Sequence, residues 1–208
     1  MARRFVLPKL VVATHNRGKA GEFAAMLSPF GVEIVSAGEL GLPVPDETGT
    51  TFEDNATLKA LAATRASGLP ALADDSGLSV HALDHQPGVY SADWEGPTRD
   101  SMVAMRRIQD ELAKRHVPDT DAARAATFHC VLALAWPDEH LELFHGTCDG
   151  SIVWPLRGSG GHGYDPCFQP LGQKAGDTRT TAQMSDAEKN AISHRGRAFR
   201  MMVEACFR

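Results

Sequence analysis

Apolar residues in the first part of the chain follow two periodicities, which predict a strand, a helix and a second strand. Residues 10–13 are apolar without interruption, as is typical of a short buried strand. Further on, apolar residues recur at the i, i+3, i+4 and i+7 spacing of one helix face, at Phe23, Met26, Leu27 and Phe30. Ile34 and Val35 predict the second strand, and a connection rich in glycine and proline follows it through Gly49.

The next helix has recognisable start and stop signals. Thr50 and Glu53 stand three residues apart and match a capping box. We therefore expect a helix that begins there and ends near Ser67, with Gly68 as its stop.

The second half of the chain alternates between the same two patterns. Helical spacing predicts a helix over Met102, Met105, Ile108 and Leu112. Residues 125–136 are apolar on both alternations, as in a central strand, and residues 137–139 form a turn. Leu141 and Leu143 alternate with polar residues, which predicts a returning antiparallel strand. A C-terminal helix is predicted by Phe199, Met202, Val203 and Cys206.

This order of elements predicts an α/β fold with a mixed central β-sheet flanked by helices. The 208 residues, 43% of them hydrophobic, are enough to bury a substantial core. Internal repeats, low-complexity tracts and a clear linker are absent from the sequence, so we expect residues 1–208 to form a single functional domain.

The net charge and the cysteine spacing indicate which partners and which cellular compartment the sequence favours. A formal net charge of -5 argues against an electrostatic partner such as nucleic acid or a membrane surface. The sequence holds no run of roughly 20 apolar residues, the length of a membrane span. The four cysteines form no C-x-x-C pair, so we expect buried thiols and a cytoplasmic location.

The first candidate binding segment follows the first predicted strand and opens the first predicted helix. It consists of Thr14, His15, Asn16, Arg17, Gly18 and Lys19. Free backbone N–H groups and the positive end of the helix dipole favour a phosphate at such a position. The segment does not match the P-loop motif, and an ordinary polar turn is the alternative interpretation.

Asn55 and Lys59 lie four residues apart and therefore share one face of the second predicted helix. A solvated helix face is the commoner explanation of such a pair, although a lysine at this position can also reach a phosphate.

The most informative segment is Asp74-Asp75-Ser76, directly after the apolar residues 69–73. We expect these residues to form a buried strand that ends at the two aspartates, where ligands collect in α/β proteins. Successive strand side chains point to opposite faces, so the aspartates are expected to differ in role. Together with Asp46 or Glu47 they provide ligands that suit Mg²⁺, and a carboxylate there can deprotonate water. An Asp-Ser-Gly turn is the alternative.

A glycine-rich segment at residues 158–163 matches G-x-G-x-x-G literally, but we reject a dinucleotide-binding interpretation. That fingerprint requires a helix directly after the glycines, and Pro166 and Pro170 make one improbable. A loop that approaches a flat ligand, with His162 and Tyr164 as stacking surfaces, is the better functional interpretation. A structural glycine turn explains the local pattern equally well.

Ser185 and Glu188 match a second capping box, and Lys189 and residues 193–195 follow it with several hydrogen-bond donors. These donors suit a phosphate or a keto-bearing base, and a charged helix surface is the alternative.

Five segments, in this order, resemble the inosine triphosphate pyrophosphatase family of purine nucleotide hydrolases. They are Thr14-x-Asn16-x-x-Lys19, Phe52-x-x-Asn55-x-x-x-Lys59, Ala73-Asp74-Asp75-Ser76-Gly77, residues 158–166 and Ser193-His194-Arg195. The resemblance spans nearly the whole chain, and the joint order and spacing are more specific than any one motif.

The resemblance implies two lobes with an active-site cleft between them, a homodimer and a Mg²⁺ requirement. It implies that Thr14 to Lys19 and Lys59 hold phosphates, and that Asp75 is the general base and a metal ligand beside Glu47. The nucleotide contacts that it implies are Ser76, His162, Gly163, Tyr164, Asp165, Lys189, His194 and Arg195. The family usually has phenylalanine at the position of His162; because an imidazole can also stack on a base, we expect activity to be retained.

The expected substrates are purine nucleoside triphosphates such as ITP, dITP and XTP, cleaved to the monophosphate and pyrophosphate. Two alternatives are a pyrophosphatase of the related Maf type, acting on pyrimidine or modified nucleotides, and a nucleotide sensor that binds without hydrolysis. The Ser-His-Arg segment favours the purine substrate, and the aspartate pair favours catalysis.

Overall fold

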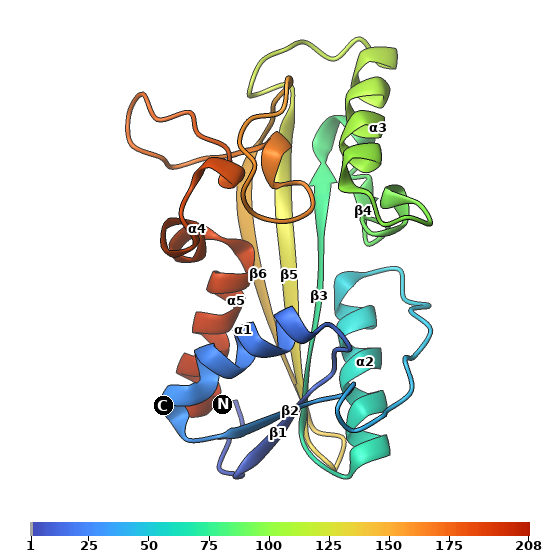
Figure 1. Ribbon diagram of the computed structural model, residues 1–208, viewed down its shortest axis with the longest axis vertical. Helices are drawn as coiled ribbons and strands as arrows, with labels where there is room; N and C mark the ends of the chain where they lie inside the picture. The colour runs from blue at the N-terminus through green and yellow to red at the C-terminus, as the bar shows by residue number, and fades with distance from the viewer. Residues whose placement is uncertain (1) are drawn as a thin grey trace. The chain divides into compact units, whose positions relative to one another are not determined.

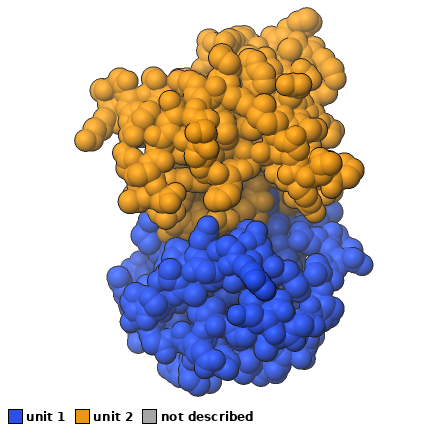
Figure 2. Space-filling view, viewed as in Figure 1, with its two compact units in different colours: residues 1–75, 131–145, 198–208 blue, residues 76–130, 146–197 orange. Residues whose placement is uncertain are grey.

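The computed structural model describes residues 2–208, and the chain divides into two compact units, coloured separately in Figure 2. Unit 1 comprises Met1–Asp75, Val131–His145 and Ala198–Arg208, whereas unit 2 comprises Ser76–Cys130 and Gly146–Arg197. Each unit is therefore assembled from segments that are far apart in the sequence.

The strands form one mixed sheet in the order β2-β1-β3-β5-β6-β7, with β4 pairing on β3. Their bounds are β1 Lys9–Val12, β2 Glu33–Ser36, β3 Ala71–Val80, β4 Pro87–Gly88, β5 Ala125–Ala135, β6 Leu141–Ile152 and β7 Phe168–Pro170. Strand β1 runs parallel to β2 and β3, but β4 and β7 pair antiparallel. Five residues connect β5 to β6, so this pair is an antiparallel hairpin. The predicted mixed sheet is confirmed.

Unit 1 contains α1 (Arg17–Leu27) and α2 (Phe52–Ser67), followed along the chain by the C-terminal helical turns. Helix α1 packs on β2 and α2 packs on β1. In Figure 1, α2 lies to one side of the strands of this unit and the C-terminal segment lies to the other. The predicted capping box is wrong by one residue, because the N-cap of α2 is Thr51, whose hydroxyl accepts from the backbone N–H of Asp54 at 3.1 Å. Gly68 ends the helix as expected, with φ of 69°.

Unit 2 contains α3 (Ser101–Lys114), α4 (Asp186–Ile192) and the first residues of α5 (His194–Met202). Helix α5 passes into unit 1 at Ala198, and a π-helical turn at Val203–Phe207 follows it there. Short 3₁₀ turns occupy Ser28–Phe30, His81–Leu83, Asp93–Glu95, Asp165–Cys167 and Thr181–Gln183. Helix α3 buries the predicted residues Met105, Ile108 and Leu112, but Met102 is 43% exposed because it lies in the first turn. Figure 1 shows α3 and α4 on opposite sides of the strands of unit 2.

Strand β3 does not end at the aspartates, as the sequence analysis had predicted, but continues through them to Val80. Its second half pairs with β4, at Leu78 with Gly88 and at Ser79 with Pro87. Because Leu78 and Val80 are fully buried, the continuation is stabilised by core packing.

The four cysteine side chains are buried thiols, which confirms that prediction. Burial raises the pKa of Cys148 and of Cys206 to about 11. No helix within residues 2–208 combines the length and apolar character needed to cross a bilayer.

Candidate active site

Three carboxylates and two lysines form the charged centre of unit 1. Lys59 Nζ on α2 lies 2.8 Å from Asp75 Oδ1 and 3.3 Å from Glu47 Oε1. The preceding aspartate, Asp74, pairs with a different lysine, Lys19 of α1, at 3.0 Å. Neighbouring positions on β3 thus reach separate partners, in agreement with the expectation that the two aspartates differ.

Asn55 connects this centre to the acidic loop before α2. Its Oδ1 accepts a hydrogen bond from the Gly49 backbone N–H at 2.8 Å, and its Nδ2 lies 3.5 Å from Asp75 Oδ2. With only 3% of its surface exposed, Asn55 does not belong to a solvated helix face. That interpretation is wrong because the loop and Asp75 supply the partners that permit burial of an amide.

Burial and neighbouring charges alter both members of the Asp75–Lys59 pair. Burial raises the pKa of the Asp75 carboxyl and the negative charges of Glu47 and Asp74 add to the rise, while Lys59 opposes it. Burial lowers the pKa of Lys59, but the carboxylates, Asp75 foremost, more than compensate, and the net effect is a raised pKa. Lys59 is therefore a permanent cation beside a carboxyl group with more than usual affinity for a proton.

The start of α1 is capped by Asn16, whose side-chain oxygen accepts from the backbone N–H groups of Gly18 at 2.8 Å and Lys19 at 3.2 Å. Thr14 Oγ1 in turn accepts from the Asn16 N–H at 3.1 Å. The prediction that these amides are free for a phosphate is therefore wrong for Gly18 and Lys19, because asparagine is a strong N-cap and occupies them.

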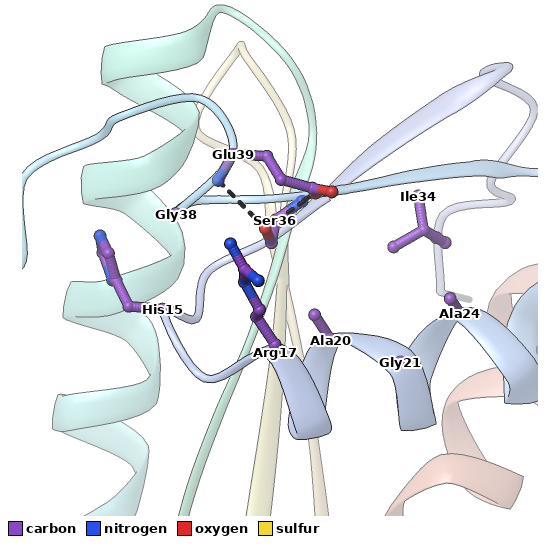
Figure 3. Close-up of a pocket in the computed structure, with 9 residues that line it drawn as sticks. All are labelled: His15, Arg17, Ala20, Gly21, Ala24, Ile34, Ser36, Gly38 and Glu39. Atoms are coloured by element: carbon purple, nitrogen blue, oxygen red, sulfur yellow. Dashed lines mark hydrogen bonds between the residues drawn. The ribbon is translucent and has the colours of Figure 1, made fainter.

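His15 and Arg17 line a groove in unit 1 with a volume of about 670 Å³. Figure 3 shows the Arg17 side chain extending from the start of α1 toward the segment 36–39. The other lining residues are Ala20, Gly21, Ala24, Ile34, Ser36, Gly38 and Glu39. His15 Nε2 donates to the Leu42 carbonyl at 2.8 Å, and Glu39 accepts from the Ser36 N–H and hydroxyl. The groove thus has the Arg17 guanidinium beside the start of α1 and the Glu39 carboxylate on the segment 36–39.

Unit 2 begins with Ser76, whose hydroxyl oxygen is buried and makes no hydrogen bond to any other group in residues 2–208. A buried hydroxyl without a hydrogen-bond partner destabilises the folded state, so the Ser76 hydroxyl is a group that a ligand could hydrogen-bond.

The glycine-rich loop of unit 2 is held in place by the buried Asp165. Its carboxylate accepts from Lys189 Nζ at 2.5 Å, from the Thr181 hydroxyl at 2.8 Å and from the His162 N–H at 2.6 Å. Gly161 has φ of 72°, and a side chain there would collide with Asp165. As predicted, no continuous helix follows the glycines, because a single 3₁₀ turn at Asp165–Cys167 leads directly into β7.

Tyr164 is not available as a stacking surface, because only 5% of it is exposed and its hydroxyl donates to the Ser91 carbonyl at 2.6 Å. The sequence analysis gave it that role because an aromatic residue beside glycines suggests a ligand platform. His162 remains exposed and is the stacking candidate of this loop.

Helix α4 begins with the predicted capping box of Ser185 and Glu188 and carries Lys189. Ser193 ends α4, and His194 and Arg195, both half-buried, begin α5. The His194 ring stacks on Phe128 of β5, with ring centroids 4.8 Å apart. Lys189, His194 and Arg195 therefore lie within seven consecutive residues, on either side of Ser193, which separates α4 from α5.

Three residues were missed by the sequence analysis as parts of the site: Gly49, Asn16 in its capping role, and Phe128. Asn16 has a detectable signal, since asparagine before a helix is a common N-cap. Phe128 has none, because its contact with His194 joins residues distant from one another in the sequence. Gly49 has none either, because its contact with Asn55 spans six residues and matches no standard capping pattern.

The donor set of unit 1 fits a divalent cation bound together with phosphate. Glu47 and Asp75 both approach one cation, the Lys59 ammonium, and Mg²⁺ typically takes one or two carboxylates plus phosphate oxygens. Within residues 2–208, three or more His, Cys, Asp or Glu side chains do not gather as a complete metal site, so a ligand would have to supply the remaining oxygens.

A buried carboxylate with a raised pKa, lysines and a metal-compatible acid pair are the groups needed to cleave a phosphoanhydride. Fold and site thus define a mixed-sheet enzyme of the phosphoanhydride hydrolase class. Residues 10–205 match the model of the Ham1 family, and the chain belongs to this family.

Relatives and solved structures agree with this membership. The chain is 54% identical to the dITP/XTP pyrophosphatase of Gluconobacter oxydans, over 95% of this chain and 90% of the relative. It is 51% identical to the dITP/XTP pyrophosphatase of Ruegeria pomeroyi, over 100% and 99%. A HAM1 protein from Coxiella burnetii superposes with a TM-score of 0.85 at 36% identity, covering 95% of this chain and 98% of that one.

Proposed function

We propose that this protein hydrolyses the triphosphates of non-standard purines, namely ITP, dITP and XTP, to the nucleoside monophosphate and pyrophosphate, and so removes them from the nucleotide pool. The observation that carries the proposal is the contact of Lys59 with both Asp75 and Glu47. The relatives named dITP/XTP pyrophosphatase, with half of their residues identical to this chain, support it.

In this proposal the triphosphate is bound by residues 14–19 and Lys59. A cation about 4 Å from a phosphate oxygen contributes about 4 kcal/mol at an effective dielectric constant of about 20. Several such groups bind a polyanion even though the whole chain carries a net charge of -5.

Asp75 is the general base. It takes a proton from the water whose oxygen attacks the α-phosphorus, and the bond from that phosphorus to the bridging oxygen of pyrophosphate breaks. Burial of Asp75 raises its pKa and so strengthens it as a base. Glu47 and Asp75 would hold Mg²⁺, which when bound neutralises charge on the phosphate oxygens.

Residues of unit 2 contact the rest of the nucleotide. Ser76, His162 and Gly163 contact it directly, whereas the buried Tyr164 and Asp165 hold the loop through Ser91 and Lys189. The donors Lys189, His194 and Arg195 serve the phosphates and the O6 atom of a 6-oxopurine. The amino group of adenine meets such donors as a mismatch, and mismatches of this kind can reject a substrate by about 10⁴-fold.

The assay that tests this function measures pyrophosphate release from ITP, XTP, dUTP, ATP and GTP with and without Mg²⁺. We expect release from ITP and XTP that depends on Mg²⁺. Preferential cleavage of dUTP would favour a Maf-type enzyme, and binding without release would favour a nucleotide sensor.

Replacement of the base tests the mechanism. Asp75→Asn should lower kcat by about 10³-fold or more, because it removes the proton acceptor and one of the two carboxylates proposed to hold Mg²⁺, whereas ITP binding through the remaining groups should stay measurable. The matched control is Asp93→Asn, which removes a charge from an exposed turn in unit 2. Normal turnover by Asp75→Asn would refute the assignment.

The proposal also includes a cytoplasmic homodimer in which residues 1–208 act as one functional domain. Sedimentation equilibrium should therefore give a mass twice that of one chain, and a mass equal to one chain would refute the dimer.

A further inference from the structure

The imidazole of His194 lies almost parallel to a buried phenylalanine. Its ring centroid is 4.8 Å from that of Phe128, and the planes meet at 13°. His194 is the first residue of α5, whereas Phe128 belongs to β5, and both lie in unit 2. The contact therefore joins a helix start to the sheet across 66 residues of sequence.

Phe128 also packs against a second aromatic ring. The ring of Phe168, which is fully buried in β7, approaches Phe128 edge-on, with centroids 4.5 Å apart and planes at 61°. Because β5 and β7 belong to the same sheet, Phe128 has little freedom to tilt. Phe128 thus presents a rigid flat surface to His194.

A hydrocarbon ring constrains an imidazole differently from a hydrogen-bond partner. Stacking fixes the plane of the imidazole without using its nitrogen atoms for that contact. If the His194 imidazole rotated about its bond to Cβ, its N–H would no longer point toward the proposed acceptor, the keto oxygen of the base. Recognition of a keto oxygen depends on such a donor being held in place before the substrate arrives.

We propose that Phe128 is a positioning residue, which holds the His194 imidazole in the orientation that recognises the purine base. This inference rests on the proposed function, in which His194 contacts the nucleotide. Phe128 does not touch the reacting atoms, so it governs substrate affinity and base discrimination rather than the chemical step.

Kinetics of a double-mutant cycle test the inference. Phe128→Leu should raise KM for ITP by about 3- to 10-fold, the range expected for loss of a stacked pair, and change kcat by less than about twofold. In the His194→Ala background the same substitution should raise KM no further, because there is no ring to position. Phe128→Tyr keeps the ring and should restore a KM close to that of the parent protein.

A control separates positioning from loss of core packing. Ile108→Val removes a methyl group from the same buried cluster without touching His194. It should lower the melting temperature but leave KM for ITP unchanged. Equal increases in KM for Ile108→Val and Phe128→Leu, or an undiminished effect of Phe128→Leu in the His194→Ala background, would overturn the inference.

A spectroscopic readout is independent of turnover. The His194 ring protons, assigned by NMR through the His194→Ala variant, should be shifted upfield by the Phe128 ring and lose that shift in Phe128→Leu. Absence of ITP hydrolysis by the parent protein would refute the proposed function, whereas retention of the shift in Phe128→Leu would refute the positioning role alone.

Discussion

Gly49 lies where any larger residue would collide with the start of α2. A Cβ atom at this position would be 2.5 Å from Asn55 Oδ1 and 2.6 Å from the Cβ of Asp54. The Gly49 N–H is also the donor that Asn55 accepts, and Asn55 in turn approaches Asp75. The acidic loop with Glu47 is therefore attached to the proposed base through a contact that only glycine permits.

Gly49→Ala should displace this loop and lower kcat/KM for ITP by about 10-fold or more, since misplacement by about 1 Å can cost that much. Steady-state kinetics at saturating Mg²⁺ measure the effect. Gly21→Ala is the control, because a Cβ there meets nothing within 4 Å. It should leave kinetics unchanged and raise the free energy of unfolding by about 0.5–1 kcal/mol, as glycine in a helix is unfavourable. Unchanged kinetics of Gly49→Ala would contradict the attachment.

The residue types in the sequence predicted which chemical groups the site contains, but they did not predict which of these groups contact one another. The aspartate pair was recognisable because two charged residues directly follow an apolar run, and Lys59 was recognisable because it lies four residues after Asn55 on one predicted helix face. Which lysine pairs with which aspartate depends on the distance between α1, α2 and β3, which no local pattern contains. The burial of Asn55 was missed for the same reason, since its partners Gly49 and Asp75 become neighbours only in the folded chain.

At the level of elements, two adjacent threonines at the start of α2 have different structural roles. The Thr51 hydroxyl caps the helix, whereas Thr50 is exposed and precedes it. Thr51→Ala should lower the free energy of unfolding by about 1 kcal/mol, the usual value of an N-cap, and Thr50→Ala should have almost no effect. Urea unfolding measures both. If the two substitutions lowered the free energy of unfolding equally, Thr51 would not be the N-cap of α2.

The cap of α4 depends on pH. Hydrogen bonds from Ser185 and Arg179 lower the pKa of Glu188 from 4.5 to about 2. A carboxyl with a lowered pKa stabilises the folded state fully above its ordinary value and loses that contribution as pH falls through the folded value. The stability difference between the parent protein and Glu188→Gln should therefore be constant above pH 4.5 and shrink toward pH 2. Urea midpoints measured across this range test it, and a difference that grows toward acid would contradict it.

Element types were predictable, whereas element ends were predictable only where a local signal marks them, as Gly68 does for α2 and Ser185 does for α4. The helical and alternating periodicities located α1, α3 and the β5–β6 hairpin because their burial follows from local spacing. The end of β3 was misplaced because two aspartates look like a strand boundary. The strand continues past them because β4, a partner from further along the chain, pairs with it.

At the scale of the whole molecule, the hydrophobic patterns predicted the mixed sheet but neither its strand order nor which segments make up the two units. Unit 1 takes three separate segments of the chain, and β3, β5 and β6 each contribute to both units. Periodicity cannot reveal such a division, because it depends on contacts between distant segments. The chain passes from unit 1 to unit 2 between Asp75 and Ser76.

The buried thiols give the protein a built-in set of chemical labels. Cys206 belongs to unit 1, whereas Cys130, Cys148 and Cys167 belong to unit 2. Alkylation needs an accessible thiolate, so the native protein should resist iodoacetamide at all four positions. Peptide mass mapping at increasing urea concentrations would give the concentration at which the cysteines of each unit become alkylated. Equal concentrations would indicate one cooperative unfolding transition, and different concentrations would indicate two.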